Sequence, residues 1–311
     1  MLVPPRRDRR WRRFFAVSWT RGYGLGMLTV LFDEAATKFG MEGHPERPAR
    51  LSNTHAYLMD EHPDWKWLKP EPAKDEDVLR VHSDEHLERL RIPTDFDADT
   101  PFYPNIEQHA RRAAGAAIGC VDLALSGERA FSLMRPPGHH ATPNTAMGFC
   151  YLNSIAIAAR YALWMGCERV AIWDFDAHHG NGTEEIVFGN QRIRFASIHQ
   201  YPGYPGTGLS SRENVLNWPI MPGTAAKVHA AAVHKALDHL LEFAPDILLV
   251  SAGFDAFVGD PITQMTLELE HFAEFGQRLK EARVPVAPIL EGGYSDELPQ
   301  LVEGFLAAWD G

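Results

Sequence analysis

The chain has 311 residues, 45% of them hydrophobic, which is the composition of a globular protein with a full apolar core. No apolar run approaches the roughly 18 residues of a membrane helix, so we expect no membrane partner. Three cysteines without CxxC spacing argue against a disulfide framework and favour a reducing, cytoplasmic setting. A net charge of −11 disfavours direct nucleic-acid binding and is compatible with a cationic substrate.

Residues 1–26 differ from the rest of the chain. They contain seven arginines and one acid, Asp8, so the remainder has 23 basic against 40 acidic residues, a charge of −17. We expect this basic extension to be disordered or to reflect a translation start placed too early, because a convincing strand begins at Met27. Residues 27–311 are expected to form a single domain, and the sequence leaves homo-oligomer formation open.

From Met27 onward, short apolar runs alternate with segments of helical spacing. The runs are typical of buried parallel strands and lie at residues 28–32, 130–134, 169–174, 193–198, 246–251 and 285–290. The helical segments lie at residues 107–125, 153–165, 223–243, 264–281 and 297–309, and residues 91–105 are expected to form a surface loop. This alternation predicts an α/β protein with a mainly parallel sheet and helices on both faces.

Polar, glycine-containing turns follow five of the predicted strands. In a parallel sheet such turns meet at the carboxyl edge, where ligands bind. The sequence therefore predicts one functional site, built from residues 135–140, 174–182, 197–199, 251–255 and 290–294.

The densest of these turns is Asp174-Phe-Asp-Ala-His-His179, which follows an apolar run. Carboxylates at the end of a buried strand are costly unless a cation compensates them, and a divalent metal is the simplest one. Asp176 and His178 alternate with apolar residues, so their side chains point the same way if the strand continues. Asp255 follows another apolar strand and is the natural third ligand. Two carboxylates and one imidazole leave a position open for water, as in catalytic zinc sites.

Two other turns supply acid–base and hydrogen-bonding groups. His139 and His140 follow a rigid Pro-Pro-Gly turn and could transfer protons near neutral pH. Asp174 and Asn181 are candidates to orient the two rings. Tyr294 follows two glycines and could donate a hydrogen bond to a developing oxyanion. Taken one at a time, these residues also have structural explanations: Asp176 could cap a helix, the two histidines could lie on a surface loop, and Tyr294 could pack in the core.

Several motifs in fixed order carry a family resemblance. The chain contains HPERPARL (44–51), RPPGHHA (135–141), GFCYLN (148–153), DFDAHHGNGT (174–183), SAGFDA (251–256) and EGGY (291–294). In this order they resemble the histone deacetylase superfamily, which includes bacterial histone-deacetylase-like amidohydrolases and acetylpolyamine amidohydrolases. The resemblance covers roughly residues 27–309. It implies an arginase-like three-layer α/β/α fold with a central, mostly parallel eight-stranded sheet.

The resemblance also implies roles for individual residues. It places zinc on Asp176, His178 and Asp255, with His140 as general base oriented by Asn181, His139 oriented by Asp174, and Tyr294 on the amide oxygen. It implies a potassium ion held by Asp174, Asp176, Ser197 and the backbone of His178 and Ile198. The residues expected along a narrow substrate channel are Gly148, Phe149, Tyr204 and Ile262, with Arg47 near an internal cavity for acetate release. The implied reaction is hydrolysis of a linear acyl amide to acetate and a free amine.

Two departures place the chain within the superfamily. Asn181 and the EGGY motif resemble the class II and bacterial amidohydrolase branch rather than class I. Ile262 stands near the position where a glutamate marks the polyamine-preferring animal enzyme, which weakens a polyamine reading without excluding it. The substrate therefore stays open among an acetyl-lysine peptide, an acetylpolyamine and a small metabolite amide.

Two other functions share parts of this pattern. A catalytically silent ligand-binding protein would be expected to have lost at least one of the catalytic or metal-binding residues, and this chain has kept them all. An arginase-like binuclear manganese hydrolase needs a further carboxylate two positions after His178, where this chain has Gly180. Metal content separates these readings: one zinc per chain against two manganese ions.

Overall fold

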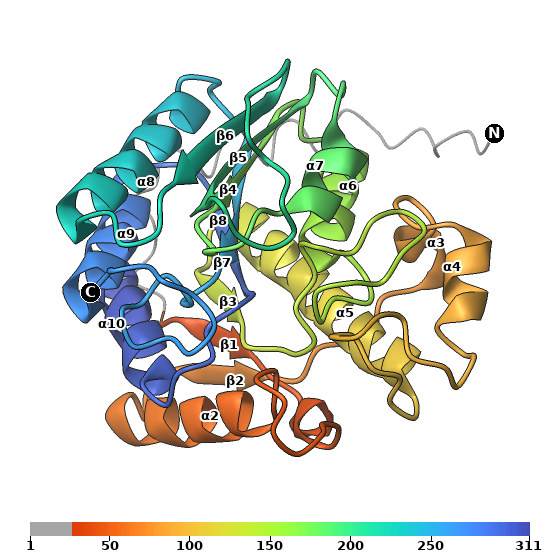
Figure 1. The fold of residues 1–311 in the computed structure, drawn as a ribbon. Coiled ribbons are helices and arrows are strands. Elements are labelled where there is room, and N and C mark those ends of the chain that lie inside the picture. Colours follow the sequence, from red (N-terminus) through yellow and green to blue (C-terminus); the bar gives the residue numbers. More distant parts are fainter. Residues whose placement is uncertain (1–26) are drawn as a thin grey trace.

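The computed structural model describes residues 27–311, which form an eight-stranded sheet covered by helices on both faces (Figure 1). All seven pairs of neighbouring strands are parallel, in the order β2-β1-β3-β8-β7-β4-β5-β6. The strands are β1 Thr29–Leu31, β2 Lys66–Leu68, β3 Ala130–Ser132, β4 Val170–Asp174, β5 Ile193–Gln200, β6 Val215–Ile220, β7 Ile247–Ala252 and β8 Val286–Leu290. The predicted α/β fold is confirmed, and the sheet is parallel throughout. The predictions for residues 1–26 lie outside the described residues.

The helices form two outer layers. α5, α6 and α7 cover one face of the sheet, while α8, α9 and α10 cover the other, with α2 packed against α10 (Figure 1). The helical elements are η1 Glu34–Thr37, α2 Ala49–Glu61, α3 Asp75–Val78, α4 Asp84–Arg89, α5 Ile106–Leu125, α6 Ser154–Met165, α7 Asn181–Val187, α8 Ala226–Leu241, α9 Leu269–Glu281 and α10 Leu298–Asp310. Among the described residues, none of these helices has the length and apolar character needed to span a membrane.

The strands β2 and β6 were missed from the sequence because they lack a strong hydrophobic pattern, and the helices α2, α3, α4 and α7 were not predicted either. β2 and β6 are the two edge strands of the sheet, so each pairs with only one neighbouring strand and is less buried than the central strands. β2 has only three residues, two of them exposed, and β6 contains Pro219, which edge strands tolerate. In contrast, every residue of β4 and β7 is buried, which is why their apolar runs were recognised.

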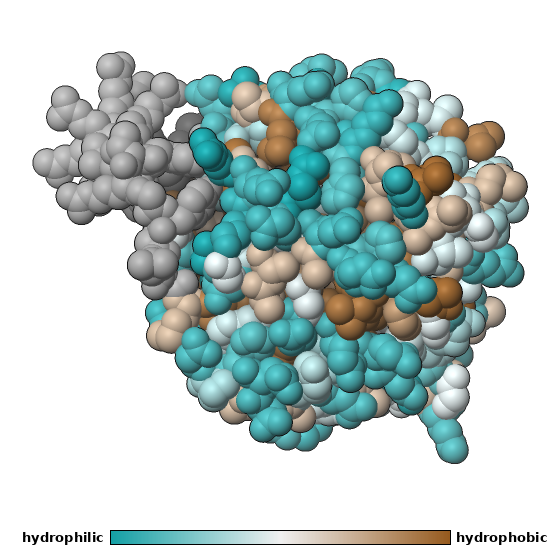
Figure 2. Space-filling view, turned by 90° about the vertical axis from the view of Figure 1, so that its left-hand side faces the viewer, coloured by the Kyte–Doolittle hydropathy of each residue, from teal (hydrophilic) through white to brown (hydrophobic). Residues whose placement is uncertain are grey.

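The outer surface of the α8–α10 layer is mostly polar. Figure 2 shows this face as largely hydrophilic, with small separate apolar spots. Exposed apolar side chains on these helices include Val228 and Leu269. Isolated apolar side chains of this kind are ordinary on a protein surface, so oligomer formation stays a prediction.

Two glycines test how closely α9 and α10 pack. A Cβ at Gly276 of α9 would lie 2.0 Å from the Phe305 carbonyl oxygen of α10, whereas a Cβ at Gly304 would meet its nearest atom, Leu269 Cδ2, at 3.4 Å. We expect Gly276→Ala to lower the free energy of unfolding by about 1–3 kcal/mol, because backbone must move. Gly304→Ala should raise it by up to about 1 kcal/mol, because alanine is the better helix former. Urea denaturation of both variants measures the free energy of unfolding. Equal changes in the two variants would contradict the close approach of α9 and α10 at Gly276.

Candidate active site

The loop after β4 carries the densest group of functional side chains. β4 ends at Asp174, so the strand does not continue to Asp176 and His178, and alternation along a strand is not what aligns them. Backbone hydrogen bonds shape the loop instead: His178 N donates to Asp176 Oδ1 at 2.9 Å, and Ala177 N donates to Asp255 Oδ1 at 2.7 Å. The second bond fixes the β4 loop to the loop after β7.

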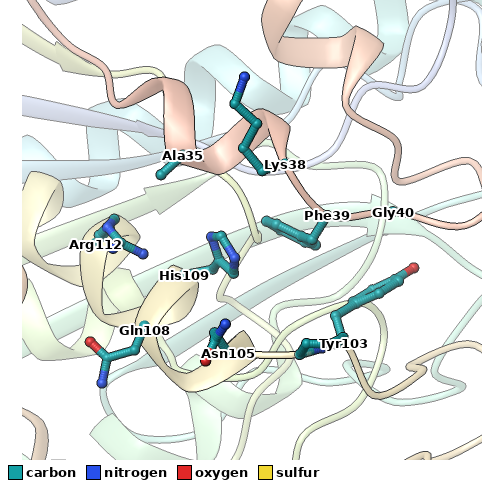
Figure 3. Close-up of a pocket in the computed structure, with 10 residues that line it drawn as sticks. Ala35, Lys38, Phe39, Gly40, Tyr103, Asn105, Gln108, His109 and Arg112 are labelled. Atoms are coloured by element: carbon teal, nitrogen blue, oxygen red, sulfur yellow. The ribbon is translucent and has the colours of Figure 1, made fainter.

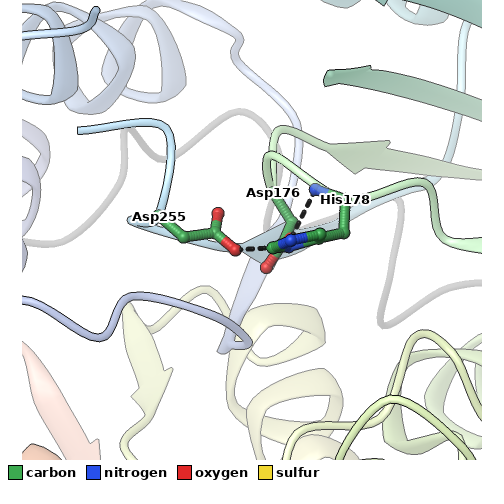
Figure 4. Close-up of side chains that lie close together, drawn as sticks. All are labelled: Asp176, His178 and Asp255. Atoms are coloured by element: carbon green, nitrogen blue, oxygen red, sulfur yellow. Dashed lines mark hydrogen bonds and ion pairs between the residues drawn. The ribbon is translucent and has the colours of Figure 1, made fainter. Parts of the chain in front are cut away.

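Asp176, His178 and Asp255 form a candidate metal site (Figure 4). Their ligand atoms lie within 4.8 Å of one another, and His178 Nδ1 is 2.8 Å from Asp255 Oδ2 and 3.2 Å from Asp176 Oδ1. Both carboxylates are buried, with 1% and 0% exposure. Two buried carboxylates beside one imidazole need a cation to balance their charge. The donor set of two carboxylates and one imidazole is one that catalytic zinc sites use, so the residues fit this metal.

The tandem histidines lie beside the metal site on the turn after β3. Their ring centroids are 4.0 Å apart, and both side chains are buried. His139 Nδ1 lies 3.0 Å from Asp174 Oδ2, and His140 Nδ1 lies 2.8 Å from Asn181 Oδ1. The structure therefore pairs each imidazole with the orienting residue that the sequence suggested.

The two imidazoles have opposite electrostatic environments. Burial disfavours the charged form of His139, but the carboxylates of Asp176, Asp174 and Glu291 outweigh burial and hold its pKa well above the ordinary value. Burial and the positive charges of His139 and His178 hold the pKa of His140 well below the ordinary value. One histidine is thus kept charged beside another kept neutral, which is the separation that acid–base chemistry needs.

Tyr294 is held from behind by Arg50. The Arg50 guanidinium lies 4.7 Å from the centre of the Tyr294 ring, and its Nε donates to Gly293 O at 2.6 Å. The Tyr294 backbone N donates to Asp260 Oδ2 at 2.7 Å. Burial raises the pKa of Tyr294 well above its ordinary value, so its hydroxyl keeps its proton. That hydroxyl is a fixed hydrogen-bond donor.

A cavity of about 260 Å³ leads to these groups. Its inner lining includes His140, His178 and Tyr294, and its remaining lining residues are Pro45, Asp99, Gly148, Phe149, Tyr204 and Ile262. Tyr204 and Ile262 are each 38% exposed and stand at the mouth. Arg47 lines a separate small hollow together with Arg50 and Asp296, so its predicted place near an internal cavity for acetate release stays a prediction. Arg47 forms an exposed ion pair with Asp296 at 2.6 Å.

The residues predicted to hold potassium lie on neighbouring strands. Asp174 of β4 is paired in register with Ser197 of β5, and Ile198 is the next residue of that strand. β5 continues to Gln200, two residues beyond the predicted end, so Ser197 lies inside the strand. The Ser197 hydroxyl lies 2.9 Å from His199 Nδ1. Potassium binding here stays a prediction.

Sequence reasoning missed several residues of the site. Arg50 packs against the Tyr294 ring and donates to the Gly293 carbonyl, whereas Arg47 pairs with the exposed Asp296 of the same loop. The HPERPARL motif contains both arginines. Glu291 is buried and accepts hydrogen bonds from Gly138 N at 2.7 Å and Ser251 Oγ at 3.1 Å. Its place in the EGGY motif was the available signal. Asp99 lines the cavity and is exposed at its mouth, in an acidic segment for which the sequence predicts only a surface loop.

The comparisons with known proteins agree with this geometry. Residues 44–309 match the family model described as the histone deacetylase domain. The chain is 46% identical to an uncharacterized protein of Synechocystis sp., over 84% of this chain and 90% of that one. It is 38% identical to a "probable deacetylase" of Archaeoglobus fulgidus, over 86% of this chain and 82% of that one.

A solved structure extends this similarity to the fold. The acetylpolyamine aminohydrolase of Burkholderia pseudomallei superposes with a TM-score of 0.84 at 27% identity, covering 91% of this chain and 98% of that one. The buried Asp-His-Asp group, the paired histidines and the parallel sheet together with these matches confirm the resemblance found in the sequence: the chain belongs to the histone deacetylase family.

Proposed function

We propose that this protein is a zinc-dependent amidohydrolase that removes the acetyl, or another acyl, group from an N-acyl amine and releases acetate. The observation that carries the proposal is the cavity that ends jointly at His140, Tyr294 and the metal ligand His178. Zinc bound by Asp176, His178 and Asp255 would supply a Lewis acid that polarises the amide carbonyl and acidifies a water molecule. A potassium ion on the Asp174 and Ser197 side is part of the same proposal.

His140 is suited to act as the general base. Asn181 Oδ1 accepts from His140 Nδ1–H, an orientation supported by Asn181 Nδ2, which donates to His140 O at 3.4 Å. This tautomer leaves the Nε2 lone pair free to accept a proton from the attacking water. Because its low pKa keeps His140 neutral, the base is available at neutral pH. The same nitrogen would then deliver the proton to the leaving amine nitrogen, while the hydroxyl stays on the acyl carbon as acetate.

His139 and Tyr294 would stabilise the developing negative charge. His139 stays protonated beside Asp174 and places a positive charge next to His140. The Tyr294 hydroxyl would donate a hydrogen bond to the oxyanion formed from the amide oxygen. Arg50 fixes the loop that carries Tyr294, so this donor is in place before the substrate enters.

The cavity walls favour an amide on a linear stem. Phe149 lines the cavity between His140 and the mouth, where Tyr204 stands, and two aromatic walls of this kind suit an extended aliphatic chain. Asp99 adds an exposed carboxylate at the mouth, where a cationic flank of the substrate would lie. These features fit acetyl-lysine in a peptide. They also fit an acetylpolyamine, which the name of the Burkholderia pseudomallei protein favours as a second candidate.

Substrate choice can be tested on the full chain reconstituted with zinc. We expect hydrolysis of an acetyl-lysine peptide and of N-acetylputrescine, and the ratio of kcat/KM identifies the preferred class. Asp99→Asn should lower kcat/KM for cationic N-acetylputrescine about fivefold, because an exposed charge pair is worth up to about 1 kcal/mol. Asp60→Asn, on the remote and exposed end of α2, is the matched control and should change nothing. If zinc binds but neither substrate is hydrolysed, the result favours a catalytically silent ligand-binding protein over an amidohydrolase.

The Asn181 contact predicts a pH dependence. Asn181→Asp would place a negative charge beside His140 Nδ1 and raise the pKa of His140. A higher pKa means that the base is protonated, and therefore inactive, up to a higher pH. We expect the acid limb of the kcat/KM profile to move up by about one to three pH units. Asn181→Ser, which adds no charge, should lack this upward shift, and an unmoved limb in Asn181→Asp would argue against His140 as the base.

A further inference from the structure

A second hollow lies outside the catalytic cavity, between the η1 segment and the first turns of α5 (Figure 3). Its volume is about 640 Å³, and it shares no lining residue with the catalytic cavity. We call it the α5 pocket. Its lining includes Lys38, Phe39, Tyr103, Gln108, His109 and Arg112.

Two side chains of the α5 pocket, His109 and Tyr103, have buried polar atoms without a hydrogen-bond partner among the described residues. His109 is 8% exposed and lies at the centre of the lining, yet among residues 27–311 neither of its ring nitrogens has a hydrogen-bond partner, and its Nδ1 is fully buried (Figure 3). The Tyr103 hydroxyl is likewise buried without a partner. A buried polar group without a hydrogen bond destabilises the fold. The Tyr103 hydroxyl points away from His109, so the unpaired imidazole of His109 is the group for which a ligand in the hollow would supply the missing partner (Figure 3).

The charge of the lining indicates the sign of that ligand. Lys38 and Arg112 are cationic, and no carboxylate lines the pocket, although the chain as a whole carries −11. Arg112 Nε lies 3.3 Å from Asp33 Oδ2, and its terminal nitrogens have no hydrogen-bond partner among the described residues. Lys38 is held only by the exposed Glu34, at 2.7 Å. The lining therefore offers donors to an anion.

The start of α5 adds to this preference. The helix is 20 residues long and its N-cap, Asn105, makes no side-chain capping bond. Ile106 N and Gln108 N already donate to Tyr103 O and Asn105 O, so this end contributes mainly through its dipole, which favours a negative charge. Burial and the charges of Arg112 and Arg135 lower the pKa of His109 to about 4, so its imidazole is neutral and has one N–H to donate.

Phe39 gives the pocket an apolar wall. Its ring centroid lies 4.5 Å from that of His109 and 5.3 Å from that of Tyr103. Each of the three rings is more than nine-tenths buried, so together they offer a narrow apolar surface on which a flat or aliphatic group can pack. A ligand that used only the charged groups would leave this surface uncovered.

We propose that the α5 pocket is a second binding site, for a small organic anion. Arg112, Lys38 and an N–H of His109 hold its phosphate or carboxylate group, and its apolar part packs on Phe39. The site is independent of the amide hydrolysis proposed above.

Calorimetric titration of the zinc-loaded full chain with phenyl phosphate tests the proposal, since this probe carries both a phosphate and a ring. Phenyl phosphate should bind more tightly than inorganic phosphate, and phenol should bind more weakly than either. Equal binding of inorganic phosphate would contradict the apolar wall, and equal binding of phenol would contradict the anion site.

Variants at position 108 locate the binding. Gln108 is exposed in the first turn of α5, so Gln108→Glu should fold normally, because an acid there suits the helix start. We expect Gln108→Glu to weaken phenyl phosphate binding roughly five- to tenfold and Gln108→Lys to strengthen it, because the charge lies in the pocket. Arg112→Gln should weaken it at least about tenfold.

The control is Lys227→Gln, which removes one exposed positive charge at the start of α8, outside the α5 pocket, and should leave the affinity unchanged. If the changes at position 108 do not alter the affinity for phenyl phosphate, the probe binds outside the α5 pocket, for example in the catalytic cavity. If Lys227→Gln weakens phenyl phosphate binding as much as Arg112→Gln does, the probe is attracted by the overall charge of the protein rather than by the α5 pocket. Either result, or the absence of measurable binding, overturns the proposal.

Discussion

Tyr294→Phe is expected to lower kcat for acyl-amide hydrolysis by about 10² to 10³-fold while leaving KM nearly unchanged. The hydroxyl would act only on the oxyanion of the transition state, and removing one such donor costs this much in other hydrolases. The ring should stay in place, because its contacts are with the Arg50 guanidinium and with Phe149, at 5.6 Å between ring centroids. Steady-state kinetics on the acetyl-lysine peptide measures the effect.

Tyr204→Phe is the matched control for Tyr294→Phe. It removes the same atom from another tyrosine of the same cavity, but Tyr204 stands at the mouth and is 38% exposed. We expect its kcat to fall far less than that of Tyr294→Phe. Comparable losses in the two variants, or a loss confined to KM in Tyr294→Phe, would remove Tyr294 from the role of oxyanion donor.

Removal of the metal should abolish activity. Chelation of the wild-type protein, or Asp255→Ala, is expected to lower kcat/KM by roughly 10³-fold or more, because the Lewis acid contributes several kcal/mol. Zinc should restore the chelated wild type and fail to restore Asp255→Ala, in which a ligand is missing from the Asp-His-Asp group. Elemental analysis should find about one zinc per chain in the wild type.

Asp174→Asn separates metal binding from catalysis. Asp174 lies against His139 Nδ1 and is not one of the three grouped ligands, so this variant should keep its zinc and lose activity. Two manganese ions per active chain would instead favour the arginase-like reading. The structure argues against that, because a Cβ at Gly180 would lie 2.3 Å from Asp174 Oδ2 and leaves no room for a further carboxylate.

The parts of the fold and site that the sequence predicted are those that strong local signals mark. β4 and β7 are continuous buried apolar runs, and both deliver their polar residues to one edge of a parallel sheet. That rule predicted that Asp255 lies beside Asp176 and His178, although 77 residues of chain separate His178 from Asp255. The convergence of loops offered Asp174 and Asn181 as orienting candidates, and the family resemblance assigned Asn181 to His140, which it contacts at 2.8 Å in the structure.

The parts that could not be predicted depend on side-chain direction and on backbone bonds between loops. Arg47 and Arg50 belong to one motif, and only tertiary packing decides that Arg50 lies against the Tyr294 ring while Arg47 pairs with the exposed Asp296. Asp260 receives the backbone N–H of Tyr294, 34 residues away, and no local pattern marks such a bond. The end of β4 at Asp174 agrees with the predicted strand, but the alignment of Asp176 and His178 beyond it comes from hydrogen bonds of the loop rather than from strand alternation.

The cavity has a buried floor and an exposed mouth, and the two come from different parts of the chain. The floor residues are tied to one another by hydrogen bonds from several strands, so almost any change there damages its neighbours as well. Tyr204 and Ile262 stand partly in solvent on connecting loops, and Asp99 is exposed. Mutation can therefore alter the selectivity of the mouth while the reaction at the floor is conserved, which is a route by which duplicated copies of such a gene acquire new substrates.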